Sequence, residues 1–275
     1  KYIAPDIARR LVKKAIGRDH ATMARGQDWT ERELLVAFRL YCRTPFGKLH
    51  QRNPEIVTLA SQIDRTPSAL AMKACNFASL DPVQQRRNIA GLGNVSSADR
   101  ALWEAFLRDP DVVATNAEAA YAKLAGMESF PADEPETPEG PSETELLVRV
   151  RRLQGFFRQT VLTSYESRCA ITGIAVPELL IASHIIPWSI NSERRADPRN
   201  GITLNAFHDR AFDRGLITFD ESWRLVLTNK LKVGEISQFQ RESLLNIEGR
   251  QLRSPIRFLP DPDAMTYHRE HVFVG

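Results

Sequence analysis

An acidic, proline-rich segment near the middle of the chain most limits how this sequence can fold. Residues 127–143 contain four prolines, and residues 127–145 hold seven Asp/Glu and no Lys or Arg. Such a stretch has too few apolar side chains to bury a core, so we expect an exposed, extended linker. The chain is therefore predicted to form two domains, residues 1–126 and residues 144–275. The linker is either a simple tether or an acidic strip that competes with a polyanion for a basic surface.

The segments on either side of the linker are mildly basic. Residues 1–126 carry 19 Lys/Arg against 13 Asp/Glu, and residues 146–275 carry 18 against 14. This balance suits a polyanionic partner such as nucleic acid. No apolar run approaches the ~20 residues needed to cross a membrane, so no membrane partner is predicted. The three widely spaced cysteines do not suggest a disulfide framework, and we predict a cytoplasmic protein.

The N-terminal domain shows the signals of helix starts. Asn53-Pro54 and Thr66-Pro67 each place a capping side chain before a proline, which predicts two short helices. The short connection Asp64-Arg65 between them is typical of a helix-turn-helix or winged-helix-like domain. In that arrangement Lys73 and Asn76 would face outward and contact DNA. An ordinary helical hairpin with a solvated polar face fits the same pattern.

The C-terminal domain is predicted to mix helices with short strands. Apolar residues recur at helical spacing from Glu145 to Tyr165, which predicts one long helix. Further helices are expected from Gln238 onward and at 264–271. Strand-like segments lie between them, at 180–186, 202–204, 216–219 and 225–228. The fold class expected for the whole chain is therefore α+β.

Three polar residues follow one another at informative positions in this domain. His184 ends an apolar strand, Asn200 precedes the turn at Gly201, and His208 lies on a helix that begins near Asn205. Hydrolysis of a phosphodiester needs a base and a cation, and imidazole can serve as the base or as a metal ligand. A buried histidine alone would more often be structural. The order strand, loop, strand, helix, with these polar residues on the first strand, the loop and the helix, favours a metal-dependent site.

Four motifs surround these residues. They are Cys169-Ala170-Ile171-Thr172-Gly173, Ser183-His184-Ile185-Ile186-Pro187-Trp188, Asn200-Gly201-Ile202-Thr203-Leu204 and His208-Asp209-Arg210-Ala211-Phe212-Asp213-Arg214-Gly215. Through these motifs the region resembles the HNH endonucleases, and most closely their bacterial restriction-type subgroup. The resemblance implies a ββα-metal fold, with His184 as general base, Asn200 orienting the loop and His208 as metal ligand. It also implies one divalent cation (Mg²⁺, Mn²⁺ or a transition ion) and double-stranded DNA as the substrate.

The chain departs from that family at several metal-binding positions. Ser183 stands where many relatives have Asp or His, and Phe212 stands where some have a further histidine. Asp213 is the nearest carboxylate and either completes the metal site or braces the helix end. Some relatives hold a structural zinc with two Cys-x-x-Cys pairs. Here Cys169 has no such partner, so we predict no structural zinc and a small buried residue at this position.

A group of arginines lies close to these motifs in the sequence. Each could be an ordinary surface charge, but together they favour contacts with DNA phosphates. They are Arg151, Arg158, Arg194, Arg195, Arg199, Arg210 and Arg214.

These observations predict a metal-dependent DNA endonuclease that hydrolyses phosphodiester bonds. The subgroup resemblance implies a restriction-type enzyme, and recognition of a modified base by the N-terminal domain is a further hypothesis. Cutting both strands with one site per chain would favour a homodimer. Ser183 and the missing second ligand leave open a DNA-binding protein with an inactive HNH core. A non-specific nuclease effector is the other alternative.

Overall fold

The protein is described by a computed structural model that covers residues 28–87, 95–126 and 141–275. The chain divides into two compact units, residues 1–156 and residues 157–275. The division falls within helix α8 (Pro141–Ser164), whereas the sequence prediction started the second domain at residue 144. Most of the predicted linker, residues 127–140, lies outside the described residues. None of the described helices is long and apolar enough to cross a membrane.

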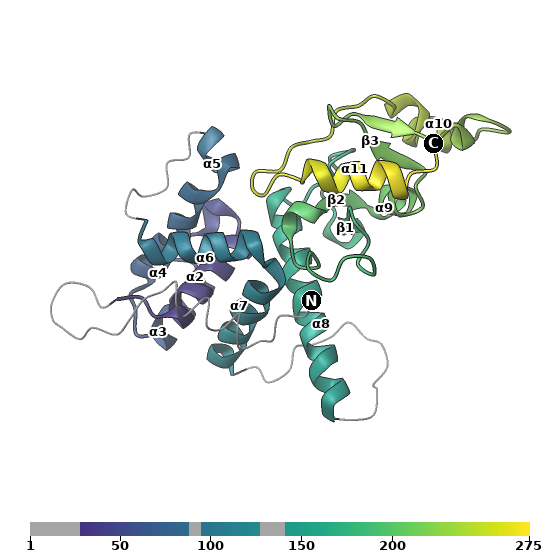
Figure 1. The fold of residues 1–275 in the computed structure, drawn as a ribbon. Helices are drawn as coiled ribbons and strands as arrows, with labels where there is room; N and C mark the ends of the chain where they lie inside the picture. The colour runs from purple at the N-terminus through teal and green to yellow at the C-terminus, as the bar shows by residue number, and fades with distance from the viewer. Residues whose placement is uncertain (1–27, 88–94, 127–140) are drawn as a thin grey trace. The chain divides into compact units, whose positions relative to one another are not determined.

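The first unit is helical throughout its described part (Figure 1). The expected helix starts are confirmed, since the side chains of Asn53 and Thr66 accept hydrogen bonds from Glu55 N and Ala69 N. Thr30 forms a complete capping box with Glu33. The helices are α2 (Glu31–Arg43), α3 (Pro54–Gln62), α4 (Pro67–Asn76), α5 (Pro82–Arg86), α6 (Ser97–Arg108), α7 (Pro110–Ala125) and the first part of α8, with 3-10 turns at Phe46–Lys48 and Phe77–Leu80.

Helix α2 is the central element of this unit and packs against α4, α6 and α7. Its Phe38 ring lies edge-on to Phe77 and Phe106, with ring centroids 5.2 and 4.8 Å apart. All three rings are fully buried. Burying rings of this size contributes about 1.5–3 kcal/mol each, so this cluster stabilises the unit's core.

The prediction that Lys73 and Asn76 face outward from α4 is wrong. Both are buried, and the Lys73 ammonium pairs with the buried carboxylate of Asp99 at 3.0 Å. Asp99 also caps α6 by accepting a hydrogen bond from Ser96 N. A lysine can reach across to such a partner, so the polar spacing of α4 by itself could not reveal the contact. The exposed side chains of α4 are Ser68 and Met72, which leaves little polar surface to read bases.

The second unit has the predicted α+β composition. Strand β1 (Leu180–His184) pairs antiparallel with β2 (Gly201–Asn205), and α9 (Ala206–Asp213) follows β2 directly and packs on both strands (Figure 1). A second antiparallel pair is formed by β3 (Ile217–Phe219) and β4 (Leu225–Leu227). The remaining elements are α10 (Gln238–Ser243), α11 (Pro262–His271) and 3-10 turns at Pro177–Leu179, Pro198–Asn200, Asn229–Lys232 and Leu245–Ile247.

Candidate functional site

The strand pair β1–β2 and the end of α8 together fix the ring of His184. His184 is paired with Gly201 across the two strands. A Cβ at Gly201 would lie 2.6 Å from a Val161 methyl and 2.7 Å from the Phe157 ring, so only glycine lets α8 come this close. The Phe157 ring stacks on the His184 ring, with centroids 3.6 Å apart and planes at 11°. The Asn-Gly step therefore makes room for the aromatic ring that sets the plane of the imidazole.

The hydrogen bonding of His184 defines its tautomer. Its Nε2 lies 3.0 Å from the carbonyl oxygen of Arg195. A carbonyl oxygen can only accept, so Nε2 carries the hydrogen and Nδ1 keeps its lone pair in the neutral ring. Burial lowers the pKa of His184 to about 4, with the Arg195 carbonyl opposing part of that shift. At neutral pH the ring is thus uncharged, with one nitrogen able to take up a proton, as a general base requires.

Asn200 holds the backbone around this histidine. It is buried, its Oδ1 accepts from Ile186 N at 2.8 Å, and its Nδ2 donates to Ile186 O at 3.1 Å. Nδ2 also lies 3.4 Å from Arg194 O. The amide therefore ties the segment after β1 to the loop before β2. This geometry suits the orienting role predicted for Asn200.

The loop arginines have partners that the sequence prediction missed. Arg194 and Arg199 both pair with the buried carboxylate of Asp197, at 3.0 and 2.9 Å. Arg195 donates to Trp188 O at 3.2 Å, and its guanidinium lies over the Trp188 ring. The sequence prediction treated these three residues as phosphate contacts. In the structure their side chains hold the loop itself.

The other arginines predicted to contact DNA differ in their exposure. Arg158 is half-buried and donates to Leu180 O at 2.9 Å. Arg151, Arg210 and Arg214 are exposed, and the latter two lie near enough to Asp213 to oppose part of the rise that burial causes in its pKa. Arg210 on α9 and Arg214 at its C-cap thus place exposed positive charge beside Asp213.

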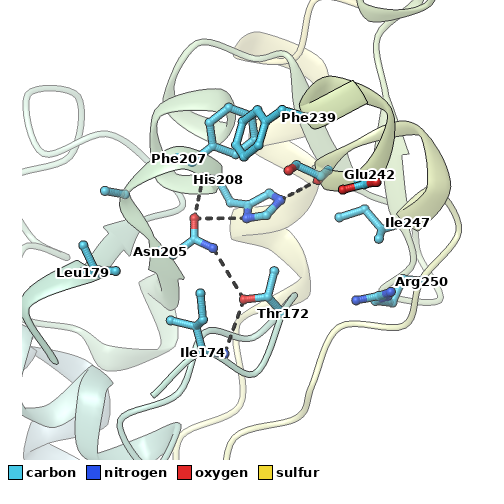
Figure 2. A pocket seen from close by; sticks show the side chains of 12 residues that line it. Thr172, Ile174, Leu179, Asn205, Phe207, His208, Phe239, Glu242, Ile247 and Arg250 are labelled. Atoms are coloured by element: carbon cyan, nitrogen blue, oxygen red, sulfur yellow. Dashed lines mark hydrogen bonds between the residues drawn. The ribbon is translucent and has the colours of Figure 1, made fainter. Parts of the chain in front are cut away.

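In the structure, each ring nitrogen of the predicted metal ligand His208 lies against an acceptor of the protein itself. His208 is buried, its Nδ1 lies 3.1 Å from Asn205 Oδ1, and its Nε2 lies 2.9 Å from Ser243 O (Figure 2). Asn205 Oδ1 also accepts from the His208 backbone N–H, so both ring nitrogens face acceptors. A ring nitrogen could bind a cation only by giving up one of these contacts. The ring is held from two directions, by the Asn205 cap of its own helix and by the backbone of Ser243 at the end of α10.

The ring of His208 also contacts Cys169, which is buried as predicted. Burial raises the pKa of the Cys169 thiol, but hydrogen bonds from His208 and Thr172 outweigh it and lower the pKa to about 7. His208, Asn205 and Thr172 line one wall of an open cavity of about 530 Å³ (Figure 2). His208 is therefore part of a polar cluster that joins α9, the segment after α8 and the end of α10.

Two carboxylates on α9, Asp209 and Asp213, are the candidate cation ligands. They are four residues apart on the helix, so they project from neighbouring turns of one face. Burial raises the pKa of both groups, and the charge of Asp209 raises that of Asp213 further. The buried Ser183 Oγ lies beside Asp209 without the geometry of a full hydrogen bond. A cation would relieve the repulsion between the two carboxylates.

This donor set fits a hard divalent ion held only in part by the protein. Over the described ranges, no three His, Cys, Asp or Glu side chains lie close enough to hold a metal ion by themselves. Mg²⁺ is commonly bound by one or two carboxylates, with water and substrate phosphate as its other ligands. Asp213 alone was predicted from the sequence as the carboxylate that could complete the metal site, and Asp209 was not. Its four-residue spacing from Asp213 on a predicted helix was the signal that could have found it.

The region that contains His184 and α9 matches a known protein family. Residues 169–220 match the family model described as HNH endonuclease, a range that includes both strands, α9 and His184. No curated protein matches the chain. The C-terminal unit therefore carries a domain of the HNH endonuclease family, which indicates a nuclease.

Proposed function

We propose that the second unit is a divalent-cation-dependent DNA endonuclease in which His184 is the general base. One observation carries this proposal. The Arg195 carbonyl and the burial of the ring keep His184 neutral, with its Nδ1 lone pair able to accept a proton. The family match supplies the reaction class, since an HNH domain indicates phosphodiester cleavage.

In the proposed reaction His184 Nδ1 takes a proton from water as the water oxygen bonds to phosphorus. The bond between phosphorus and the 3′ oxygen breaks, and the leaving oxygen takes up a proton from solvent water, giving 5′-phosphate and 3′-hydroxyl ends. A cation, when bound, would neutralise charge on the phosphate and the leaving oxygen. Asp209 and Asp213 would hold it, and Asn200 would keep the backbone around His184 in place. Arg210 and Arg214 are the exposed residues best suited to contact the DNA backbone.

We further propose a restriction-type role, with unit 1 contributing to DNA recognition and a homodimer cutting both strands. The subgroup resemblance of the motifs and the helical fold of unit 1 support this part of the proposal. Lys73 and Asn76 are excluded as contacts because they are buried. Digestion of methylated and unmethylated plasmid would test recognition of a modified base, and equal digestion would count against it.

A plasmid cleavage assay with Mg²⁺, Mn²⁺, Co²⁺ or Ni²⁺ tests the proposed activity. The wild-type chain should cut, His184→Ala should not, and His271→Ala should cut like wild type. His271 is a matched control because it is an exposed histidine of the same unit. Wild-type chain that binds DNA but cuts with none of these ions would favour a DNA-binding protein with an inactive core.

A further inference from the structure

The loop before β2 is held by one buried carboxylate. Asp197 is fully buried, and its two oxygens accept hydrogen bonds from the guanidinium groups of Arg194 and Arg199. Asp197 Oδ1 also accepts from Arg199 N at 2.9 Å. A buried carboxylate paired in this way is well satisfied, whereas removing its charge would leave two arginines without a shared partner.

The same loop is anchored to a distant part of the unit. Arg194 Nη2 donates to Asp261 Oδ2 at 2.7 Å, and Asp261 N donates to Arg199 O at 2.8 Å. Asp261 is the N-cap residue of α11, where its Oδ1 accepts from Asp263 N. Asp197 and Asp261 therefore fix the loop from two sides through Arg194.

The part of the loop held in this way carries the acceptor for His184. Arg195, whose carbonyl receives the His184 Nε2–H, lies between Arg194 and Asp197 in the chain. The neighbouring Arg194 carbonyl faces the Asn200 amide. The group behind a catalytic histidine fixes its tautomer and orientation, and losing that group costs activity without removing the base itself.

We propose that Asp197 is a positioning residue for the proposed nuclease site. By holding Arg194 and Arg199 it keeps the Arg195 carbonyl against His184 Nε2, so that Nδ1 stays the proton acceptor. Asp197 does not touch the His184 ring in the described contacts, and its effect passes through the loop backbone. The kinetic part of this inference rests on the proposed function, whereas the tautomer of His184 does not depend on cleavage.

The tautomer can be measured directly in the full chain. With ¹⁵N-labelled histidine, the ring nitrogen shifts distinguish Nε2–H from Nδ1–H, and His184→Gln assigns the His184 signals. The wild-type ring is expected as the Nε2–H form. Asp197→Asn should convert it to a mixture of both tautomers. Asp220→Asn is the matched control, because the side chain of Asp220 accepts hydrogen bonds only from Ser222 N and Arg224 N in the described contacts.

Kinetics provide the second measurement. A shift of the base by ~1 Å costs about 100-fold in rate, so Asp197→Asn should lower kcat about 100-fold with little change in KM. Folded Asp197→Asn with an unchanged His184 tautomer would overturn the inference. If that variant does not fold, Arg194→Gln takes its place, because Asp197 then keeps Arg199. An unchanged tautomer in folded Arg194→Gln would equally overturn it.

The two measurements separate this inference from the proposed function. A tautomer shift in a chain whose wild type does not cut DNA would leave the positioning role standing and remove the nuclease proposal. If the wild type cuts DNA but the His184 tautomer is unchanged in Asp197→Asn, the nuclease proposal stands and the positioning role of Asp197 is removed.

Discussion

His184 and His208 are both histidines of the strand–strand–helix region, but their surroundings fit them for different tasks. The His184 ring has one nitrogen bonded to a carbonyl, and its Nδ1 makes no hydrogen bond among the described contacts. The His208 ring has acceptors at both nitrogens. A base or ligand needs a lone pair that points to the reactant. The comparison teaches that a free lone pair, and not the position in a motif alone, decides what a histidine can do.

The two sides of α9 repeat this contrast. His208 faces the polar cluster with Cys169 and Ser243, whereas Asp209 lies beside Ser183 of β1. The neighbouring residues His208 and Asp209 therefore lie in different surroundings, and of the two only Asp209 is a candidate cation ligand here. Variants at His184, Asp209 and His208 test this division.

The largest effect is expected at His184. His184→Gln removes the group that takes the proton, and loss of a general base costs about 10²–10⁴-fold in rate. Plasmid cleavage followed over time, with His271→Gln as control, measures it. Cleavage of the His184→Gln chain at more than a tenth of the wild-type rate would contradict the assignment of the base.

Asp209→Asn is expected to have the next largest effect. The substitution removes one of the two carboxylates proposed to bind the cation. Loss of even a supporting group at a metal site costs ~10–100-fold in affinity or activity. The concentration of Mn²⁺ that gives half-maximal cleavage should rise at least tenfold by the same principle. Asp213→Asn should act in the same direction, and Asp263→Asn, on α11, is the control. An unchanged Mn²⁺ dependence in both α9 variants would remove these residues from the metal site.

His208→Gln should act on stability and hardly on the cation. The change disturbs buried hydrogen bonds to Asn205 and Ser243, which costs roughly 1–3 kcal/mol. Urea unfolding followed by circular dichroism measures the loss, and the folded variant should need the same Mn²⁺ concentration for cleavage. Unchanged stability together with a higher Mn²⁺ requirement would restore His208 as a ligand.

The last effect develops only at acidic pH. Burial lowers the pKa of both His184 and His268 from the ordinary histidine value of 6.5 to about 4. The unfolded chain therefore takes up these protons first as the pH falls. Both contributions to stability are complete above about pH 6.5 and decline toward pH 4, by at most ~1.4 kcal/mol per pH unit and histidine.

Urea unfolding at pH 7, 6 and 5 tests this dependence. His268→Gln should remove its own contribution and flatten the decline relative to wild type. His268 is the cleaner probe, because its ring is buried and stacked on Phe212 within the core. An equally steep decline in that variant would show that His268 is not held neutral in the folded protein.

Much of the fold could be predicted from local signals in the sequence. The caps at Asn53 and Thr66, the helix ending near Tyr165 and the two strands around His184 follow from side chains that act on their own or adjacent residues. Such contacts depend on spacing of a few residues, which the sequence displays directly. The C-terminal core was predictable for the same reason, because its motifs occupy one continuous stretch.

The contacts that the sequence did not show join distant segments. Lys73 pairs with Asp99 on another helix, and His208 lies against the Ser243 carbonyl of α10. The proposed role of Asp197, which the sequence analysis did not single out, depends partly on Asp261, more than sixty residues later. A single sequence does not show which long-range partner a polar side chain meets, so the spacing on α4 alone placed Lys73 at the surface.

Equilibrium binding of Mn²⁺ to a complex that cannot cut tests the central division most directly. The His184→Gln chain with double-stranded DNA provides that complex, and Asp209→Asn or His208→Gln is added to it. Calorimetric titration should show Mn²⁺ binding weakened at least tenfold by Asp209→Asn and unchanged by His208→Gln. Weakened binding with folded His208→Gln, and normal binding with Asp209→Asn, would contradict the assignment of the two sides of α9.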